Sequence, residues 1–257
     1  MKRRDVILGS TGLLLPVIGR SAVPCPPSPV SIAGGTSVTT PCPAPKATYT
    51  TNFPLTERPI SEGGRWTSGG TCGKTIVQTS PGKAYGTMAG FDRRNYIDSC
   101  ACLRDFGPNH EVTGTIANSG GFSGYSLEVE LLLRAEIAAD HIHLYEVDCV
   151  WGGLGIALVR WDMTTAHPNS FTFLRRLKSG EVLFANGDQV YASIVGSVIT
   201  VKYKRAGRAF STLFTHDTAG DCVRYSSGNP GIGFWNESGN ASIVSNFAWS
   251  SFTADSI

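Results

Sequence analysis

The stretch HIHLYEVDCVWGGLGIALVRWD, residues 141–162, holds the pattern that decides the fold of this chain. Two apolar runs, at 141–151 and 154–161, flank the dipeptide Gly152-Gly153. Glycine adopts the positive φ angles that a two-residue hairpin turn requires, so the stretch predicts two antiparallel strands joined at these glycines. The predicted register pairs Cys149 with Ile156, Tyr145 with Arg160 and His143 with Asp162.

A third strand is expected ahead of this hairpin. The connection at residues 137–140 would pair Glu136 with His141 and Arg134 with His143. Because side chains alternate across a strand, one face then carries a set of polar groups. This set is Arg134, Glu136, His141, His143, Tyr145, Arg160 and Asp162. Towards the glycine turn the same face becomes apolar. A face that changes from polar to apolar in this way fits the open end of a concave sheet, and it also fits an ordinary solvent-facing sheet edge.

The rest of the chain repeats short apolar runs between turn residues. Among its 257 residues are 30 Gly and 14 Pro, while charged residues make up only 16%. Such a composition favours strands and turns, and it excludes a coiled coil or a protein with many membrane spans. We predict an all-β fold, a two-sheet antiparallel β-sandwich of the jelly-roll type. Strands are expected at residues 126–137, 141–151, 154–161, 170–177, 189–195, 198–203 and 231–235.

The first 49 residues differ from the rest of the chain. Residues 1–22 combine a basic start, an apolar stretch and a small-residue end, which is the form of a secretory signal. The opening Arg3-Arg4-Asp5 also resembles the bacterial twin-arginine export motif. The apolar stretch is shorter than the roughly 20 residues of a spanning helix. We therefore expect an export signal at 1–22, a Pro-rich tether at 23–49 and one domain at 50–257, in a periplasmic or extracellular protein.

The charge balance excludes two classes of partner. Four of the 22 basic residues and one of the 20 acidic residues lie in the expected signal, so the remaining 18 basic and 19 acidic residues nearly balance. A nearly neutral domain has no field that attracts nucleic acid or an anionic membrane surface. We therefore expect no nucleic-acid partner.

An exported protein can form disulfides, and this chain has seven cysteines, an odd number. The bridges that the sequence allows are Cys25 with Cys42, Cys72 with Cys100 or Cys102, and Cys149 with Cys222. No paired Cys/His spacing completes a zinc site, so no metal or cofactor is assigned. A structural calcium site would use Asp188, Asp217 and Asp221, but aspartates are also common in surface turns.

The chain resembles bacterial concanavalin A-like, laminin-G-like jelly rolls over about residues 66–252. The motifs that carry the resemblance are turns and core strands: 145–147 (YEV), 156–161 (IALVRW), 169–172 (NSFT), 187–192 (GDQVYA), 196–201 (GSVITV) and 228–234 (GNPGIGF). The resemblance implies a concanavalin A-like β-sandwich. Since this superfamily includes lectins, carbohydrate-binding modules, glycoside hydrolases and polysaccharide lyases, the fold does not select the function.

A glycoside hydrolase needs two carboxylates that flank the scissile bond. Glu146-Val147-Asp148 begins like the Glu-x-Asp-x-x-Glu motif of laminarinase-type glucanases, but Trp151 stands where the second Glu is required. Without that carboxylate the reaction has no general acid. Glu128 and Glu130 also share a strand face, where acids are commonly just solvated. The sequence therefore argues against hydrolysis.

A polysaccharide lyase needs a group that neutralises the uronate carboxylate, a base and an acid, which are usually Arg, His and Tyr. His141-Ile142-His143 resembles the Gln-Ile-His motif of alginate lyases, with Arg134 on the strand before it. Residues 203–207 (YKRAG) resemble a C-terminal segment of those enzymes. The chain departs from the family in its missing Arg-rich strand motif and in His141 replacing Gln. An alginate lyase-like enzyme that uses Arg134, His143 and Tyr203 is the alternative function.

Sugar binding needs aromatic platforms beside hydrogen-bonding groups. Trp161, Trp235 and Trp249 lie in apolar strands, which predicts core positions. Trp151 at the hairpin tip is the best platform, with Tyr145, Arg160 and His143 beside it. Because no catalytic set is complete, we predict an exported carbohydrate-binding or adhesion protein with a glycan partner, and among enzymes a lyase before a hydrolase. A structural or protein-binding jelly-roll domain is the remaining alternative.

Overall fold

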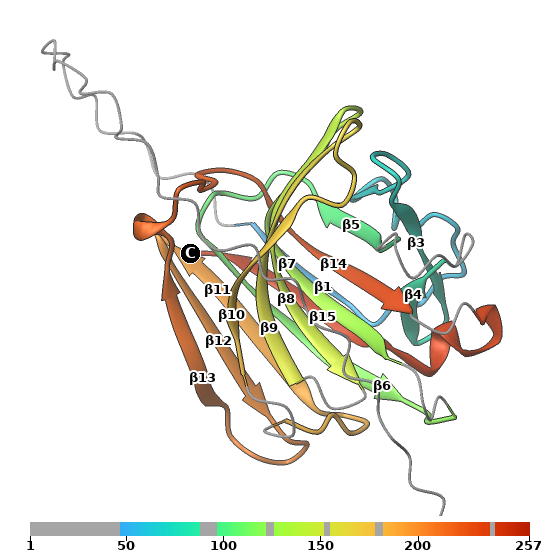
Figure 1. Ribbon diagram of the computed structural model, residues 1–257. Helices are drawn as coiled ribbons and strands as arrows, with labels where there is room; N and C mark the ends of the chain where they lie inside the picture. Colours follow the sequence, from blue (N-terminus) through green and yellow to red (C-terminus); the bar gives the residue numbers. More distant parts are fainter. Residues whose placement is uncertain (1–46, 88–96, 122–125, 152–154, 178–181, 237–239) are drawn as a thin grey trace, which may run out of the picture. The chain divides into compact units, whose positions relative to one another are not determined.

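A computed structural model of the chain describes residues 47–87, 97–121, 126–151, 155–177, 182–236 and 240–257 (Figure 1). The described strands are β1 Thr48–Thr51, β2 Trp66–Ser68, β3 Thr75–Ser80, β4 Lys83–Gly86, β5 Ser99–Leu103, β6 His110–Asn118, β7 Leu127–Ile137, β8 His141–Trp151, β9 Gly155–Thr164, β10 Phe171–Arg176, β11 Gln189–Val195, β12 Val198–Lys204, β13 Ser211–Asp217, β14 Asn229–Asn236 and β15 Phe247–Ser256. Two short 3-10 helices, η1 Thr218–Gly220 and η2 Ala241–Asn246, are the only helices in these ranges. Neither of them could cross a membrane.

The predicted all-β fold is confirmed. Strands β8 and β11 begin and end at the predicted residues, and β7, β9, β10, β12 and β14 lie within a few residues of theirs. The prediction lacked β1 to β6, β13 and β15, most of which are short or have Thr, Ser and Gly between their apolar residues. The expected export signal and nearly all of the tether lie outside the described residues.

Hydrogen bonds join the strands into one path, β10-β9-β8-β7-β14-β5-β3-β4-β15-β6-β11-β12-β13, with β1 beside β15 and β2 beside β5. All of these pairs are antiparallel except that of β3 with β5. Strand β3 pairs with β5 in parallel through Thr75 and Ile76, and then with β4 antiparallel from Val77 onward. Strand β3 thus connects the first half of the path, from β10 to β5, with the second half, from β4 to β13.

The two halves of this path enclose one hydrophobic core. Leu131 on β7 and Tyr145 on β8 belong to the same buried cluster as Ile116 on β6 and Phe252 on β15. The Trp249 indole on β15 donates a hydrogen bond of 3.1 Å to the backbone carbonyl of Glu130 on β7. Strands β7 and β8 therefore have an inner face against this core and an outer face, which carries several acidic side chains.

The cysteines correct part of the sequence analysis. Cys72, Cys100, Cys102 and Cys149 are buried free thiols, so the expected bridges from Cys72 to Cys100 or Cys102 are absent. Cys222 is disulfide-bonded, but its partner is not Cys149, whose thiol is free. Burial raises the pKa of the Cys102 thiol to about 12, which keeps it protonated and unreactive.

Candidate functional site

The β8–β9 hairpin has the predicted register. His143 lies opposite Asp162, Tyr145 opposite Arg160 and Cys149 opposite Ile156. The Gly152-Gly153 turn itself lies outside the described residues. Side chains on the inner face of β8 therefore change from histidine at the start of the strand to core residues towards its end, as the sequence predicts.

The expected register between β7 and β8 is wrong. Glu136 lies opposite His143 instead of His141, and the hairpin closes at Ile137 and Ile142. The Ala138 amide donates to the His141 carbonyl at 2.9 Å, which completes the turn. A bulge precedes Glu136, where Arg134 adopts a φ of 47°. Because a bulge re-aims one side chain, Arg134 does not lie opposite His143.

Tyr225, which the sequence analysis did not identify, organises the open end of this inner face. Its ring stacks on His143, with centroids 5.0 Å apart and an interplanar angle of 7°. Its hydroxyl donates to the Asp162 carboxylate, and its backbone amide donates to the Tyr145 hydroxyl at 3.0 Å. Arg160 forms an ion pair of 2.9 Å with the same Asp162. Tyr225 lies outside any strand, so no periodic pattern marked it.

The structure brings together only two of the three residues expected for a lyase. Arg134 donates to the backbone carbonyl of Tyr225 at 2.7 Å, so it lies beside the tyrosine on which His143 stacks. Tyr203 belongs to β12 in the other half of the strand path, where its hydroxyl donates to the Asp188 carboxylate. Arg134 also donates to the carbonyls of Pro108 and Gly196 and to the Asn109 side chain, so its guanidinium already has several protein partners.

The residues expected to bind a ligand have mixed surroundings. Tyr145 is fully buried in the core, and Arg160 is only 8% exposed. Trp151 is half-buried and packs on Phe247, with ring centroids 6.1 Å apart. The indole of Trp151 therefore belongs at least partly to the core. Its role as a sugar platform stays a prediction.

The aspartates considered for calcium do not meet. Asp188 accepts hydrogen bonds from the backbone amides of Ala185 and Ala206 and from Tyr203. Asp217 caps η1, and Asp221 pairs with His216 at 2.9 Å. Each carboxylate thus already has local partners.

The outer face of β7 and β8 carries a cluster of acids, hereafter the acid cluster. It consists of Asp98, Glu128, Glu130, Glu146 and Asp148. Glu130 on β7 lies opposite Asp148 on β8, so the strand register brings two acidic sequence motifs together. Carboxylate oxygens of Glu128, Glu146 and Asp148 lie within 4.8 Å of one another. Glu128 from β7 therefore lies beside the two carboxylates of β8.

Burial makes the acid cluster unusual. Glu130 is 0% exposed, and neither of its carboxylate oxygens has a hydrogen-bond partner among the described residues. Glu146 accepts a hydrogen bond from the Trp161 indole. Lys74 forms an ion pair of 3.1 Å with Asp98, and both side chains are almost fully buried. The Lys74 ammonium group is paired with Asp98, and one positive charge cannot neutralise the five carboxyl groups of the acid cluster.

Protonation relieves this imbalance. Burial, together with repulsion from Asp98, raises the pKa of Asp148 to about 8. Burial and repulsion from neighbouring carboxylates raise the pKa of Glu128, Glu130 and Glu146 well above the usual range. The protonated form of these carboxyl groups is therefore favoured, because several like charges cannot all ionise in a dry space.

A shallow, partly open pocket adjoins the acid cluster where β7 begins and β14 ends. Its lining includes Glu128, Trp235, Asn236 and Thr87. Glu128 and Trp235 are half-buried, so both present part of their surface to the pocket. The prediction that Trp235 is a core residue is therefore wrong, whereas Trp161 and Trp249 are buried as predicted.

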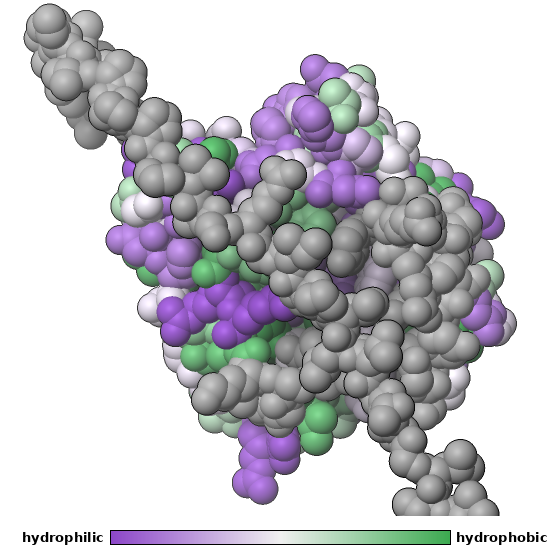
Figure 2. Space-filling model, in the orientation of Figure 1, coloured by the Kyte–Doolittle hydropathy of each residue, from purple (hydrophilic) through white to green (hydrophobic). Residues whose placement is uncertain are grey.

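A second exposed surface lies on β10, at the edge of the first half of the path. Phe173 is 39% exposed, and the Arg176 guanidinium lies over its ring at 3.4 Å from the centroid. Figure 2 shows strongly hydrophilic and hydrophobic surface next to each other in the region of this strand.

Comparison with known proteins gives structural likeness only. No family model matches the chain. No curated protein matches it either. Among solved structures, a carbohydrate-binding module, CBM66 from Bacillus subtilis, is 12% identical, with a TM-score of 0.43 over 77% of this chain and 96% of that one.

Two further solved structures show a likeness of the same order. A family 16 endo-glucanase from Bacteroides ovatus is 9% identical, with a TM-score of 0.47 over 80% of this chain and 99% of that one. The exoplasmic domain of the protein VIP36 is 8% identical, with a TM-score of 0.46 over 74% of this chain and 83% of that one. At these values the function has to be argued from the residues of this chain.

Proposed function

We propose that this protein binds carbohydrate, and that the sugar occupies the pocket between the start of β7 and the end of β14. The observation that carries the proposal is the presence of the Glu128 carboxylate, the Trp235 indole and the Asn236 amide in one pocket. The export signal expected at residues 1–22 belongs to the proposal, and would put the protein in the periplasm or outside the cell.

The chemistry of this pocket suits a sugar ring. A carboxylate accepts hydrogen bonds from vicinal hydroxyls, and an amide both donates and accepts. An indole offers an apolar face for the C–H face of the ring. Because the pocket is shallow, it would hold one edge of a polysaccharide chain rather than enclose a small molecule, as adhesion to a polymer requires.

Hydrolysis of a glycan is the second candidate function, and one observation favours it. Retaining glycosidases place two carboxyl groups about 5 Å apart, one protonated and one ionised. The carboxylates of Glu128, Glu146 and Asp148 lie within that range of one another, and their pKa values are raised. Only Glu128 is more than slightly exposed, so binding is the function that the geometry supports better.

One experiment separates these functions. The purified chain is passed over immobilised neutral and uronate polysaccharides, and the same polymers are assayed for new reducing ends and for the ultraviolet absorbance of unsaturated uronates. Retention without either product supports binding. New reducing ends alone indicate hydrolysis, and rising absorbance indicates the lyase alternative, for which the sequence suggested Arg134, His143 and Tyr203.

Variants assign the retention to the pocket. Glu128→Gln keeps the size of the side chain and removes the carboxyl group, and Trp235→Ala removes the platform. Both should weaken retention by about tenfold or more, which corresponds to about 1.4 kcal/mol. Phe210→Ala is the control, because Phe210 is 38% exposed and does not line the pocket. Equal retention of all three variants would place the sugar elsewhere.

A further inference from the structure

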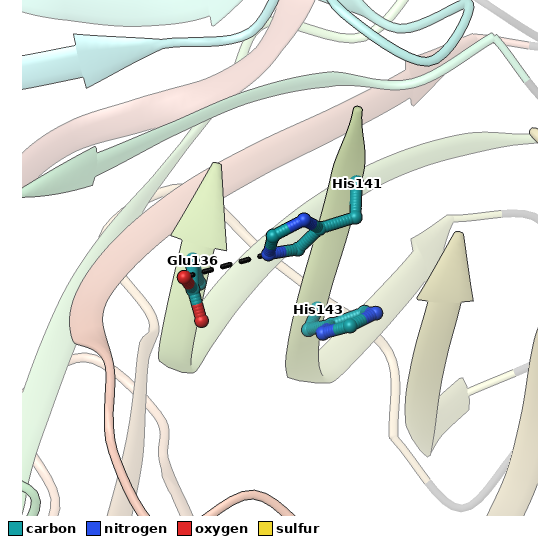
Figure 3. A group of neighbouring side chains, drawn as sticks. All are labelled: Glu136, His141 and His143. Carbon is teal, nitrogen blue, oxygen red and sulfur yellow. Dashed lines mark ion pairs between the residues drawn. The ribbon is translucent and has the colours of Figure 1, made fainter. Parts of the chain in front are cut away.

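A group of imidazole and carboxylate side chains lies where β7 ends and β8 begins, on the inner face and away from the pocket. Glu136 lies opposite His143, and His141 precedes His143 by two residues on the same face. The two histidine rings have centroids 4.5 Å apart, and His141 Nε2 lies 3.4 Å from Glu136 Oε1 (Figure 3). One ligand atom from each residue lies within 4.8 Å of the other two.

The histidines are held in place by neighbours. His141 Nδ1 lies 2.9 Å from the Asp140 carboxylate, which favours the proton on Nδ1 and leaves the Nε2 lone pair facing Glu136. A carboxylate that orients a histidine through its other nitrogen is the usual support of a metal-bound imidazole. His143 is stacked on Tyr225, which fixes the plane of its ring.

We propose that Glu136, His141 and His143 bind one divalent transition-metal ion of the zinc type. Two imidazoles and one carboxylate are ligands that Zn²⁺ accepts, and three protein ligands leave a fourth position open. Glu136 is exposed and the histidines are half-buried, so the ion is reached from solvent. It would join the ends of two strands that a four-residue turn connects.

The donor atoms predict selectivity. Imidazole nitrogen favours Zn²⁺, Cu²⁺ and Ni²⁺ over Ca²⁺ and Mg²⁺, which prefer oxygen ligands. An excess of Ca²⁺ should therefore not displace Zn²⁺ from these two imidazoles and one carboxylate.

The test is titration of the untagged full chain with ZnCl₂ in a calorimeter, with Co²⁺ absorption spectra as a second readout. We expect one Zn²⁺ per chain, no displacement by excess Ca²⁺, and the visible bands of Co²⁺ bound to nitrogen. His141→Ala and Glu136→Gln should abolish this binding. Asp140→Asn should weaken it by about tenfold, because it removes the orienting carboxylate but no ligand.

Matched controls keep the proposal open to refutation. His167→Ala removes an exposed histidine that is not in the group, and it should leave both readouts unchanged. Thermal unfolding of each metal-free variant verifies that the variant folds. The His141 and Glu136 side chains are partly exposed, so at least one of the two variants should remain folded. No zinc binding by the wild type, or undiminished binding by both ligand variants, would overturn the proposal.

Discussion

Glu130 on β7 and Asp148 on β8 lie directly opposite each other, and both carboxyl groups are buried. In the sequence each of the two residues belongs to a short acidic motif on its own strand, and solvent exposure would explain either motif by itself. Their pairing turns two ordinary motifs into the acid cluster. The stability of the protein should therefore depend on the protonation of this cluster.

The first prediction concerns pH. The pKa of Asp148 is raised from 3.8 to about 8, so the folded chain binds more protons than the unfolded chain between these values. The free energy of unfolding should therefore fall as the pH rises from 5 to 8, by more than about 1.4 kcal/mol, the equivalent of one pKa unit for one group. Urea denaturation in buffer with a chelator measures this. Glu130→Gln removes one titrating carboxyl group and should lessen the fall; a free energy that rises with pH would contradict the prediction.

The second prediction concerns Gly233 on β14, which lies opposite Glu130. A Cβ atom at Gly233 would lie 2.0 Å from Glu130 Oε2, so an alanine there displaces the buried carboxylate. Gly233→Ala should lower the free energy of unfolding by about 2 kcal/mol. Gly220→Ala, where a Cβ would meet nothing within 4 Å, is the matched control and should be nearly neutral. Equal stability of the two variants would mean that the Glu130 carboxylate is not held against Gly233.

The third prediction concerns Arg134. Its guanidinium donates to the carbonyls of Pro108, Tyr225 and Gly196, which lie in three separate segments. An ammonium group cannot reach all three, so Arg134→Lys should lower the free energy of unfolding by about 3 kcal/mol. Arg104→Lys, at an exposed arginine, should change it little. Denaturation curves compare the two variants, and a loss below 1 kcal/mol at Arg134 would refute the assigned role.

The fourth prediction concerns the Tyr225 hydroxyl, which donates to Asp162 and to the Trp161 carbonyl. Tyr225→Phe keeps the ring that stacks on His143 but removes both hydrogen bonds. It should cost about 1 kcal/mol of stability and leave polysaccharide retention unchanged, because Tyr225 does not line the pocket. If retention is lost while the variant remains folded, the sugar contacts this end of the inner face instead.

The fifth prediction concerns the thiols. Cys72, Cys100, Cys102 and Cys149 are buried and free. Burial raises the pKa of Cys100, Cys102 and Cys149, so few of these groups are thiolates at neutral pH. Iodoacetamide should leave all four unmodified in the native protein and alkylate all four in urea, as mass spectrometry would show. Rapid labelling of the native chain would mean that the buried region around the labelled cysteine opens to solvent.

The sequence by itself determined what depends on local periodicity. Apolar runs between turn residues predicted β7 to β12 and β14. The glycine pair predicted the register of β8 and β9, since a short turn fixes the register of the strands that it joins. The approach of His143 to Asp162 followed from that register.

Only the tertiary structure decided what depends on strands that are distant in sequence. Strand β14 lies beside β7, and Asp98 and Lys74 reach the acid cluster from the segments around β3 and β5. The bulge at Arg134 and the position of Tyr225 are set by the backbone carbonyls and rings that surround them. Such contacts depend on how the whole core packs, and a two-residue side-chain period carries no information about which distant strand becomes the neighbour.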